Sequence, residues 1–259
     1  IFFQGQDITH VNKKELAQLR HKMQIIFQDP NSSLDHRKTI ESTVREPMKL
    51  SRLYTKTEID ARVDEMMDLV GVDKRMRAAY PHELDGGRRQ RVGIARALAT
   101  DPKFVVCDEP VSALDVSIQA QILNLLQDIQ EQRRLTYMFI THDMSVVKHI
   151  ANVICVMYLG NVIEYCPAKE LFANPLHPYT QALLSAIPST DIDHPKERII
   201  LRGELSSPIN PKPGCRFTVR CKFATPECEQ PQQLREITPG HMCACCRYEQ
   251  IAGEMTFKA

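Results

Sequence analysis

A short apolar run that ends in two acidic residues limits what this chain can fold into more than any other feature. Residues 104–107 are Phe-Val-Val-Cys, the pattern of a strand covered on both faces in a parallel sheet. Asp108 and Glu109 follow directly. Adjacent carboxylates at the end of a buried strand repel each other and lose hydration, so a cation or a reaction usually accounts for them. On their own they also fit a strand that surfaces into a polar loop.

Composition and charge narrow the class of protein. The 259 residues include 43% hydrophobic and 25% charged ones, as in an ordinary globular protein, and the net charge of +1 gives no sign of nucleic acid as a partner. No apolar run approaches the roughly 20 residues that span a bilayer, and no secretory signal opens the chain. The nine cysteines, an odd number, favour a reducing compartment over a disulfide framework. We therefore expect a cytosolic protein.

Apolar periodicity indicates an α/β body with a helical insertion. Residues 1–8 and 23–28 are strand-like, and the second run ends at Gln28 before a turn. Residues 39–79 have helical periodicity. Asp85 suits the N-cap of a helix that opens with two glycines, which fits either an anion site or a simple capped helix. The arginines of that helix are more typical of a solvated face than of a phosphate site: Arg88, Arg89, Arg91 and Arg96.

Further strands follow the acidic pair. An amphipathic helix is predicted over residues 116–132, and apolar strands over 135–140 and 153–158. This alternation predicts right-handed crossovers and one parallel sheet, whose strands all end at the edge where ligands bind. His142 follows the strand over 135–140, so we expect it beside the acidic pair. A lone histidine there is more often structural, but this neighbourhood favours a functional role.

Five segments, in this order, resemble the motifs of ATP-binding cassette (ABC) ATPases. The resemblance spans about residues 1–165, and the ordered set is specific although each motif alone is common. It implies an α/β fold: an ABC-type P-loop NTPase core with a mostly parallel sheet and a helical subdomain at about 39–100. The motifs are the Q-loop glutamine Gln28, the signature over 84–91 (Leu-Asp-Gly-Gly-Arg-Arg-Gln-Arg), Walker B over 105–110 (Val-Val-Cys-Asp-Glu-Pro), the D-loop over 112–115 (Ser-Ala-Leu-Asp) and the switch histidine in 140–143 (Ile-Thr-His-Asp).

The resemblance implies a role for each matching residue. Asp108 would hold Mg²⁺, usually through water, and Glu109 would polarise the water that attacks ATP. His142 would bind the γ-phosphate. Gln28 would contact Mg²⁺ or the water and link the site to membrane subunits, and Asp115 would communicate across a dimer interface. ATP and Mg²⁺ are therefore the implied cofactors.

The signature segment departs from the family pattern. In the family it completes the nucleotide site of the opposite subunit, so Leu84, Asp85, Gly86, Gly87 and Arg88 would serve a partner's ATP. The usual Leu-Ser-Gly-Gly-Gln is here Leu-Asp-Gly-Gly-Arg. An ionised Asp85 would present negative charge to the γ-phosphate, and Arg88 can offset it. We expect one site of reduced or altered activity and an asymmetric transporter.

A second departure concerns the phosphate loop. No Gly-x-x-x-x-Gly-Lys-Ser/Thr motif occurs in the 259 residues. We interpret the chain as a fragment, expect the loop some tens of residues before Ile1, and expect the fragment by itself to be inactive.

The last third resembles oligopeptide and dipeptide importers. Residues 160–164 and 171–184 match the segment that follows the ATPase core in those proteins. Physically, the second of them predicts a helix over 179–187 that is bounded by proline. We therefore divide the chain into an ATPase core at 1–165 and a loop-rich, cysteine-containing extension at 166–259.

A cysteine set in this extension is associated with a 4Fe-4S cluster in relatives. Four thiolates from a loop-rich segment suit either iron–sulfur or zinc. Free thiols in a reducing cytosol are the alternative. Cys243 and Cys246 are additional, which leaves the fourth ligand open. The cysteines that match best are Cys215, Cys221, Cys228 and Cys245.

The resemblance implies the ATP-hydrolysing subunit of an ABC importer of peptides or related small solutes such as nickel. It would lie at the cytoplasmic face of the membrane, with two permease subunits, a second ATPase that is identical or different, and indirectly an extracytoplasmic solute-binding protein. Two alternatives differ in class. One is a non-catalytic structural or regulatory half of an ABC dimer. The other is a soluble ABC ATPase of DNA repair or translation, which the importer-like last third disfavours.

Overall fold

The computed structural model describes residues 1–188, 198–201, 203, 204, 207, 209–211 and 213–254. The chain forms two compact units, Ile1–His142 and Asp143–Ala259. Among the described residues, no helix is both long and apolar enough to cross a membrane.

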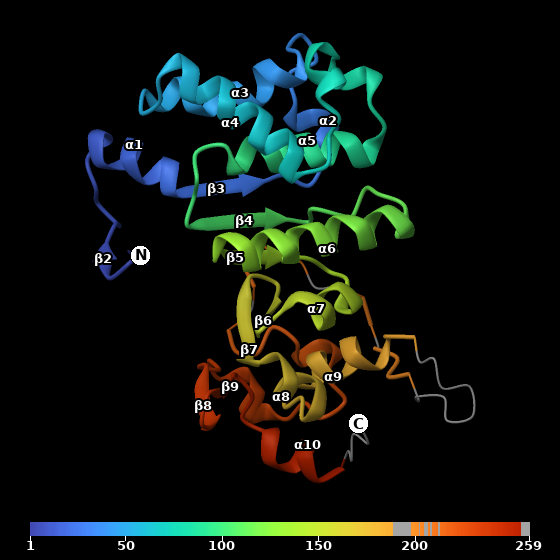
Figure 1. Cartoon of the computed structure of the whole chain (residues 1–259). Coiled ribbons are helices and arrows are strands. Elements are labelled where there is room, and N and C mark those ends of the chain that lie inside the picture. The colour runs from blue at the N-terminus through green and yellow to red at the C-terminus, as the bar shows by residue number, and fades with distance from the viewer. Residues whose placement is uncertain (189–197, 202, 205–206, 208, 212, 255–259) are drawn as a thin grey trace. The chain divides into compact units, whose positions relative to one another are not determined.

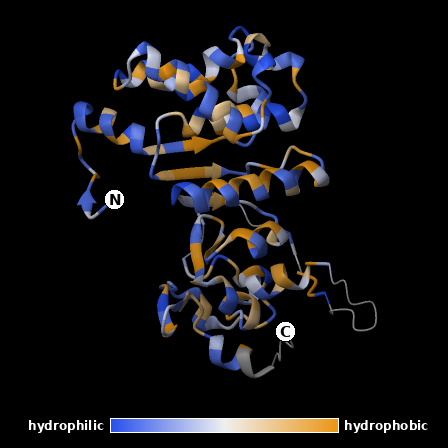
Figure 2. Cartoon of the chain, viewed as in Figure 1, coloured by the Kyte–Doolittle hydropathy of each residue, from blue (hydrophilic) through white to orange (hydrophobic). Residues whose placement is uncertain are grey.

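The first unit contains a three-stranded parallel sheet in the order β3-β4-β5 (Figure 1). Its strands are β3 (Met23–Ile26), β4 (Phe104–Asp108) and β5 (Thr136–Ile140). Val105 and Cys107 of β4 are fully buried, and the β4 ribbon has hydrophobic colours over most of its length (Figure 2). The α/β class and the parallel sheet predicted from the apolar runs are therefore confirmed.

Helices accompany this sheet. In α1 (Lys13–Lys22), Asn12 and Glu15 form a capping box, which fixes where the helix begins. In α6 (Val116–Arg133), the apolar face predicted for this helix is buried at Ile122, Leu126 and Ile129.

A helical insertion separates β3 from β4. The helical periodicity predicted for residues 39–79 is confirmed in α4 (Lys56–Leu69), where Ile59, Val63, Met66 and Met67 form one buried face. Figure 1 shows the longer helices of the insertion gathered together. The elements are α2 (Pro30–Ser33), α3 (Ile40–Ser51), α4 (Lys56–Leu69), η1 (Lys74–Ala78), η2 (Pro81–Glu83) and α5 (Gly86–Leu98).

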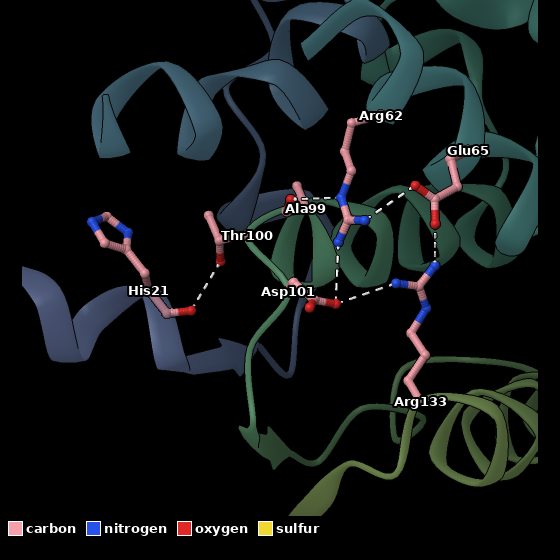
Figure 3. A network of polar contacts seen from close by, with 7 residues as sticks. All are labelled: His21, Arg62, Glu65, Ala99, Thr100, Asp101 and Arg133. Atoms are coloured by element: carbon pink, nitrogen blue, oxygen red, sulfur yellow. Dashed lines mark hydrogen bonds and ion pairs between the residues drawn. The ribbon is translucent and has the colours of Figure 1, made fainter. Parts of the chain in front are cut away.

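An ion network joins the insertion to the sheet unit (Figure 3). Arg62 of α4 contacts Glu65 at 3.1 Å and Asp101 at 3.2 Å. Arg133 of α6 contacts the same two carboxylates, at 2.5 Å and 3.3 Å. The Arg62 Nε also donates to the carbonyl of Ala99 at 3.2 Å. These contacts connect α4, the segment before β4 and the end of α6.

The second unit has a four-stranded antiparallel sheet in the order β6-β7-β9-β8. The prediction that residues 153–158 extend the parallel sheet is wrong. Leu159 (φ 46°) and Gly160 (φ 82°) are left-handed and close a tight turn, so the chain returns beside the strand as a hairpin. The strands are β6 (Val153–Tyr158), β7 (Asn161–Pro167), β8 (Arg235–Thr238) and β9 (His241–Cys243).

The start of the chain also differs from the prediction. Residues 1–8 were expected to form one strand, but β1 (Phe2–Phe3) and β2 (Gln6–Asp7) form a hairpin. Gln4 (φ 51°) and Gly5 (φ 79°) supply the turn.

Aromatic packing organises the rest of the second unit. Phe217 is 1% exposed, and its ring lies 5.3 Å from that of Tyr158 and 5.5 Å from that of Tyr179. The helix predicted over 179–187 is α9, with proline at its first position as expected. The helical elements of this unit are α7 (Met144–Ile150), α8 (Ala168–Ala173), α9 (Pro178–Ser185), η3 (Thr218–Arg220), η4 (Pro226–Glu229) and α10 (Tyr248–Glu254).

Candidate functional site

Polar side chains meet where the three parallel strands end. Gln28 lies two residues beyond β3 and His142 two residues beyond β5, while Asp108 ends β4 and Glu109 follows it. The register pairs Asp108 with Ile140 of β5, which brings these strand ends to one edge. The structure therefore brings together the residues that sequence analysis placed at this edge.

The Glu109 carboxylate is held from two sides. The Gln28 Nε2 donates to Glu109 Oε2 at 2.7 Å. The His142 Nδ1 lies 2.9 Å from Glu109 Oε1. The Glu109 side chain is 22% exposed and that of His142 76%, so the carboxylate is oriented while the imidazole stays open to a ligand.

The backbone at Glu109 is strained. Its φ of 43° lies in the left-handed region, which is unfavourable for a residue with a side chain. The Glu109 N–H donates to the Ile140 carbonyl at 2.9 Å, and the Ser112 N–H donates to the Glu109 carbonyl at 3.2 Å. These bonds hold a turn that directs the carboxylate toward the strand ends. Strain of this kind is typical of functional positions.

Such an arrangement suits reactions in which water attacks an anion. An oriented carboxylate can accept a proton from water or polarise it, and a neighbouring imidazole can contact a phosphate. Asp108, which is half-buried, supplies the kind of oxygen that Mg²⁺ prefers.

The segment over residues 84–88 begins α5. Leu84 is buried, and the Asp85 Oδ1 accepts a hydrogen bond from the Arg88 N–H at 2.7 Å, so Asp85 is the N-cap that the sequence predicts. The Arg88 Nη1 lies 3.5 Å from Asp85 Oδ2. The charge of Asp85 is thus partly balanced inside its own motif. Gly86 and Gly87 form the first helical positions.

Three other arginines of α5 make contacts that the sequence did not reveal. Arg89 contacts the Asn31 side chain, and Arg96 donates to the Ser33 carbonyl, so both hold the segment that follows Gln28. Arg91 donates to the Val70 carbonyl at 2.7 Å. The interpretation of these three as a solvated face is wrong. Carbonyl partners from distant segments leave no pattern in the sequence.

Asp115 occupies the N-cap position of α6. Its backbone carbonyl accepts a hydrogen bond from the Gln119 N–H at 2.8 Å, and its side chain is exposed. The Gln119 Nε2 donates to the Leu114 carbonyl at 2.9 Å. The turn from Glu109 to α6 is therefore tied at several points.

Comparison with known proteins identifies the family. The protein-family model described as "ABC transporter" matches residues 1–112. The family model described as "Oligopeptide/dipeptide transporter, C-terminal region" matches residues 163–228. The oligopeptide transport ATP-binding protein AppF of Bacillus subtilis is 49% identical over 252 residues, which cover 96% of this chain and 77% of AppF. The chain belongs to the ATP-binding subunits of oligopeptide/dipeptide ABC transporters. These subunits are ABC ATPases, which use ATP and Mg²⁺ and couple hydrolysis to transport.

Solved structures support the same fold. The structure of cbiO1 from Clostridium perfringens, part of the ABC transporter complex cbiONQ, aligns with a TM-score of 0.60 at 30% identity over 66% of this chain and 67% of cbiO1. A dimeric post-hydrolysis state of the ATP-binding cassette MJ0796, bound to ADP and Pi, aligns with a TM-score of 0.57 at 27% identity, over 64% of this chain and 72% of that one. The predicted ABC-type core is thereby confirmed.

A second polar cluster, in the other unit of this ATP-binding subunit, escaped sequence analysis. The Glu164 carboxylate accepts the backbone N–H groups of Leu176 and His177 at 2.7 Å and 3.0 Å, and lies 2.8 Å from His241 Nε2. Glu164 is 0% exposed and both histidines are 1% exposed. Burial lowers the pKa of His177 to about 4, so its imidazole is neutral at physiological pH. The sequence signal was a glutamate inside an apolar strand.

The four cysteines of the predicted cluster line one pocket that is partly open to solvent. Burial raises the pKa of Cys215 and Cys221, and raises that of Cys245 to about 12, so thiols without a ligand would stay protonated there. All nine cysteines are free. The sulfur donors suit a thiophilic metal or cluster. Across the described part of the chain, however, no three potential ligands are arranged to hold a metal ion.

The other two cysteines of the tail, Cys243 and Cys246, lie in different surroundings. Cys243 is fully buried in β9, where it lies opposite Glu164. The Cys246 Sγ lies 3.8 Å from that of Cys228. Cys245 is thus the only one of the three late cysteines among the described pocket-lining residues, with Cys246 next to one of them.

Proposed function

We propose that the chain binds and hydrolyses ATP to power the import of peptides by an ABC transporter. The observation that carries this proposal is the Glu109 carboxylate held by Gln28 and His142 at the ends of three parallel strands. The name of AppF, an oligopeptide transport protein, supports peptides as the substrate. Nickel or another small solute is the alternative cargo.

Each residue at the strand ends has a proposed role. Glu109 accepts a hydrogen bond from the attacking water, and its fixed orientation lowers the entropy cost of reaching that geometry. Gln28 holds this carboxylate and contacts the water or Mg²⁺. Asp108 would bind Mg²⁺, which neutralises charge on the phosphates. The exposed ring of His142 would bind the γ-phosphate.

The signature segment is proposed to act on a partner's ATP. Leu84 anchors it, and Gly86 and Gly87 would lie near the phosphates. Asp85 adds negative charge at this place, and its bond to the Arg88 N–H and the nearby Arg88 guanidinium partly offset the effect of that charge. We expect a composite site of reduced activity. Asp115 would take part in the dimer contact.

The proposed partners are two membrane permease subunits and a second ABC ATPase, identical or different. A solute-binding protein would act through the permeases. We propose the cytoplasmic face of the membrane as the location of the chain. A functional boundary near residue 165 stays a proposal: its support is the C-terminal family model that begins at 163, whereas the compact units divide between His142 and Asp143.

The cysteine pocket is proposed to hold a 4Fe-4S cluster or zinc through Cys215, Cys221, Cys228 and Cys245. The support is that all four line one pocket. Such a group would cross-link and stabilise the loop-rich tail. Iron, sulfide and zinc analysis after anaerobic purification tests this, and a protein that lacks all three would rule it out.

The test of the main proposal is Glu109→Gln in the full-length protein, assembled with its permeases and second ATPase. ATP turnover should fall by at least about 100-fold, because a general base typically contributes that much. Glu131→Gln, an exposed glutamate of α6, is the matched control. Unchanged turnover in the Glu109 variant would instead favour a non-catalytic half of the dimer. Failure to co-purify with membrane subunits would favour a soluble ABC ATPase.

A further inference from the structure

The glycines of the signature segment face the D-loop and α6 of their own chain. A β-carbon built at Gly87 would lie 2.7 Å from Ile118 Cγ2 and 3.6 Å from Asp85 Oδ1. A β-carbon at Gly86 would lie 3.3 Å from Leu114 Cδ2. Both glycines therefore leave room for side chains of residues 114–118.

Backbone conformation does not explain these glycines. Both are helical positions of α5, and neither belongs to the glycines with positive φ among the described residues. A glycine in such a position usually weakens a helix relative to alanine. The contact at Gly87 supplies a steric reason. Ile118 is β-branched and lies in a helix, so its Cγ2 has little freedom to turn away.

The contacting residues follow a turn that is bonded to the Glu109 backbone carbonyl. The Ser112 N–H and hydroxyl both bond to the Glu109 carbonyl, at 3.2 Å and 3.1 Å. The Leu114 N–H donates to the Val111 carbonyl at 3.2 Å. These bonds link the Glu109 backbone to Leu114 and the start of α6.

We propose that Ile118 is a positioning residue that holds the signature helix against the start of α6, directly after the D-loop of its own chain. The inference rests on the proposed function, in which Glu109 serves the chain's own ATP and Gly87 serves the partner's. Through the contact between Ile118 and Gly87, the two segments move as one body. Hydrolysis at one site would then shift the signature that closes the other.

A different explanation is that Gly87 only leaves space for the partner's phosphate. The two explanations differ before any nucleotide is added. A clash inside the chain lowers the stability of the nucleotide-free protein, whereas a clash with phosphate does not. They also differ in rescue, because shortening Ile118 relieves only the internal clash.

The experiment compares Gly87→Ala, Ile118→Ala and the double variant in the full-length protein. Gly93→Ala is the matched control, since a β-carbon there meets nothing within 4 Å in the same helix. Without nucleotide, Gly87→Ala should lower the melting temperature by roughly 3–8 °C, and Ile118→Ala should restore much of that loss in the double variant. In the assembled transporter, Gly87→Ala should lower kcat at least about tenfold, with recovery to within about threefold of Ile118→Ala in the double variant.

Two outcomes overturn the proposal. One is a Gly87→Ala protein whose melting temperature equals that of wild type. The other is a double variant as inactive as Gly87→Ala. If Gly87→Ala does not fold, Gly86→Ala with and without Leu114→Ala provides the same comparison at the longer contact. The Glu109→Gln assay is independent, so a failure of the proposed ATPase function is distinguished from a failure of this contact.

Discussion

Each unit of the molecule holds a glutamate bonded to a histidine, and the two pairs differ in burial. Glu109 and His142 lie 2.9 Å apart with side chains 22% and 76% exposed. Glu164 and His241 lie 2.8 Å apart with side chains 0% and 1% exposed. The distances are nearly equal, so distance alone does not reveal a role. What differs is whether a ligand can reach the pair.

The other partners of the two glutamates reinforce this contrast. Glu109 takes a side-chain amide from Gln28, which can exchange for water or a metal-bound ligand. Glu164 takes two backbone N–H groups at the start of α9, which belong to the fold itself. We infer that the exposed pair serves chemistry and the buried pair joins β7, β9 and the segment before α9.

The largest effect on stability is expected for Glu164→Ala. This change leaves two backbone N–H groups and His241 Nε2 without an acceptor in a buried place, so we expect a loss of about 3–5 kcal/mol in the free energy of unfolding. Glu109→Ala, the matched control, should cost less than about 1 kcal/mol because that pair is exposed. Urea denaturation measures both. Equal losses would show that the two pairs have the same structural weight.

The pH dependence of stability probes the buried cluster next. The pKa of His177 is about 4 when folded and 6.5 without the fold. Because folding lowers this pKa, the neutral imidazole contributes fully to the free energy of unfolding above pH 6.5. That contribution is lost as pH falls toward 4, by about 3 kcal/mol. His177→Asn keeps a cap for the Tyr179 N–H and removes the titration. Denaturation at several pH values should show the wild type losing about 3 kcal/mol more than the variant, and parallel curves would contradict the assignment.

The exposed site was easier to predict from sequence than the buried cluster. Asp108, Glu109 and His142 follow apolar strands, and parallel strands end at one edge, so their positions follow from a short-range pattern. Gln28 came from the family resemblance. Glu164 and His241 are 77 residues apart, and only the pairing of β7 with β9 brings them together. No periodicity of a single segment records that pairing.

The fold shows the same limit. The apolar runs predicted β4, β5 and α6 closely, because each is decided by its own residues. Residues 153–158 were assigned to the parallel sheet on the order of elements alone. The left-handed turn at Leu159 and Gly160 instead directs that strand into a hairpin. The sequence shows the glycine of this turn. Whether the turn is left-handed depends on the conformation that the chain adopts.

Asp85 offers a smaller test of what exposure permits. Its carboxylate is 61% exposed, and serine can replace it as an N-cap. Asp85→Ser should therefore leave the melting temperature nearly unchanged. It should raise ATP turnover in the assembled transporter roughly fivefold, or about 1 kcal/mol, because a negative charge near the γ-phosphate is removed. Asp85→Asn removes the charge and keeps the cap, so it should give the same gain. If neither variant changes turnover, Asp85 does not face the nucleotide.

The smallest effect is expected at the ion network of Arg62, Glu65, Asp101 and Arg133. Glu65 and Asp101 are 46% and 50% exposed, and each arginine contacts both. When one ion pair is lost, water and the remaining arginine therefore compensate for much of its stabilising free energy. Arg133→Gln should cost less than about 1 kcal/mol in urea denaturation. Arg62→Gln should cost more than Arg133→Gln, because the Ala99 carbonyl also loses its donor. A loss at Arg133 as large as that expected for Glu164→Ala would mean that exposure is a poor guide to the weight of an ionic contact in this protein.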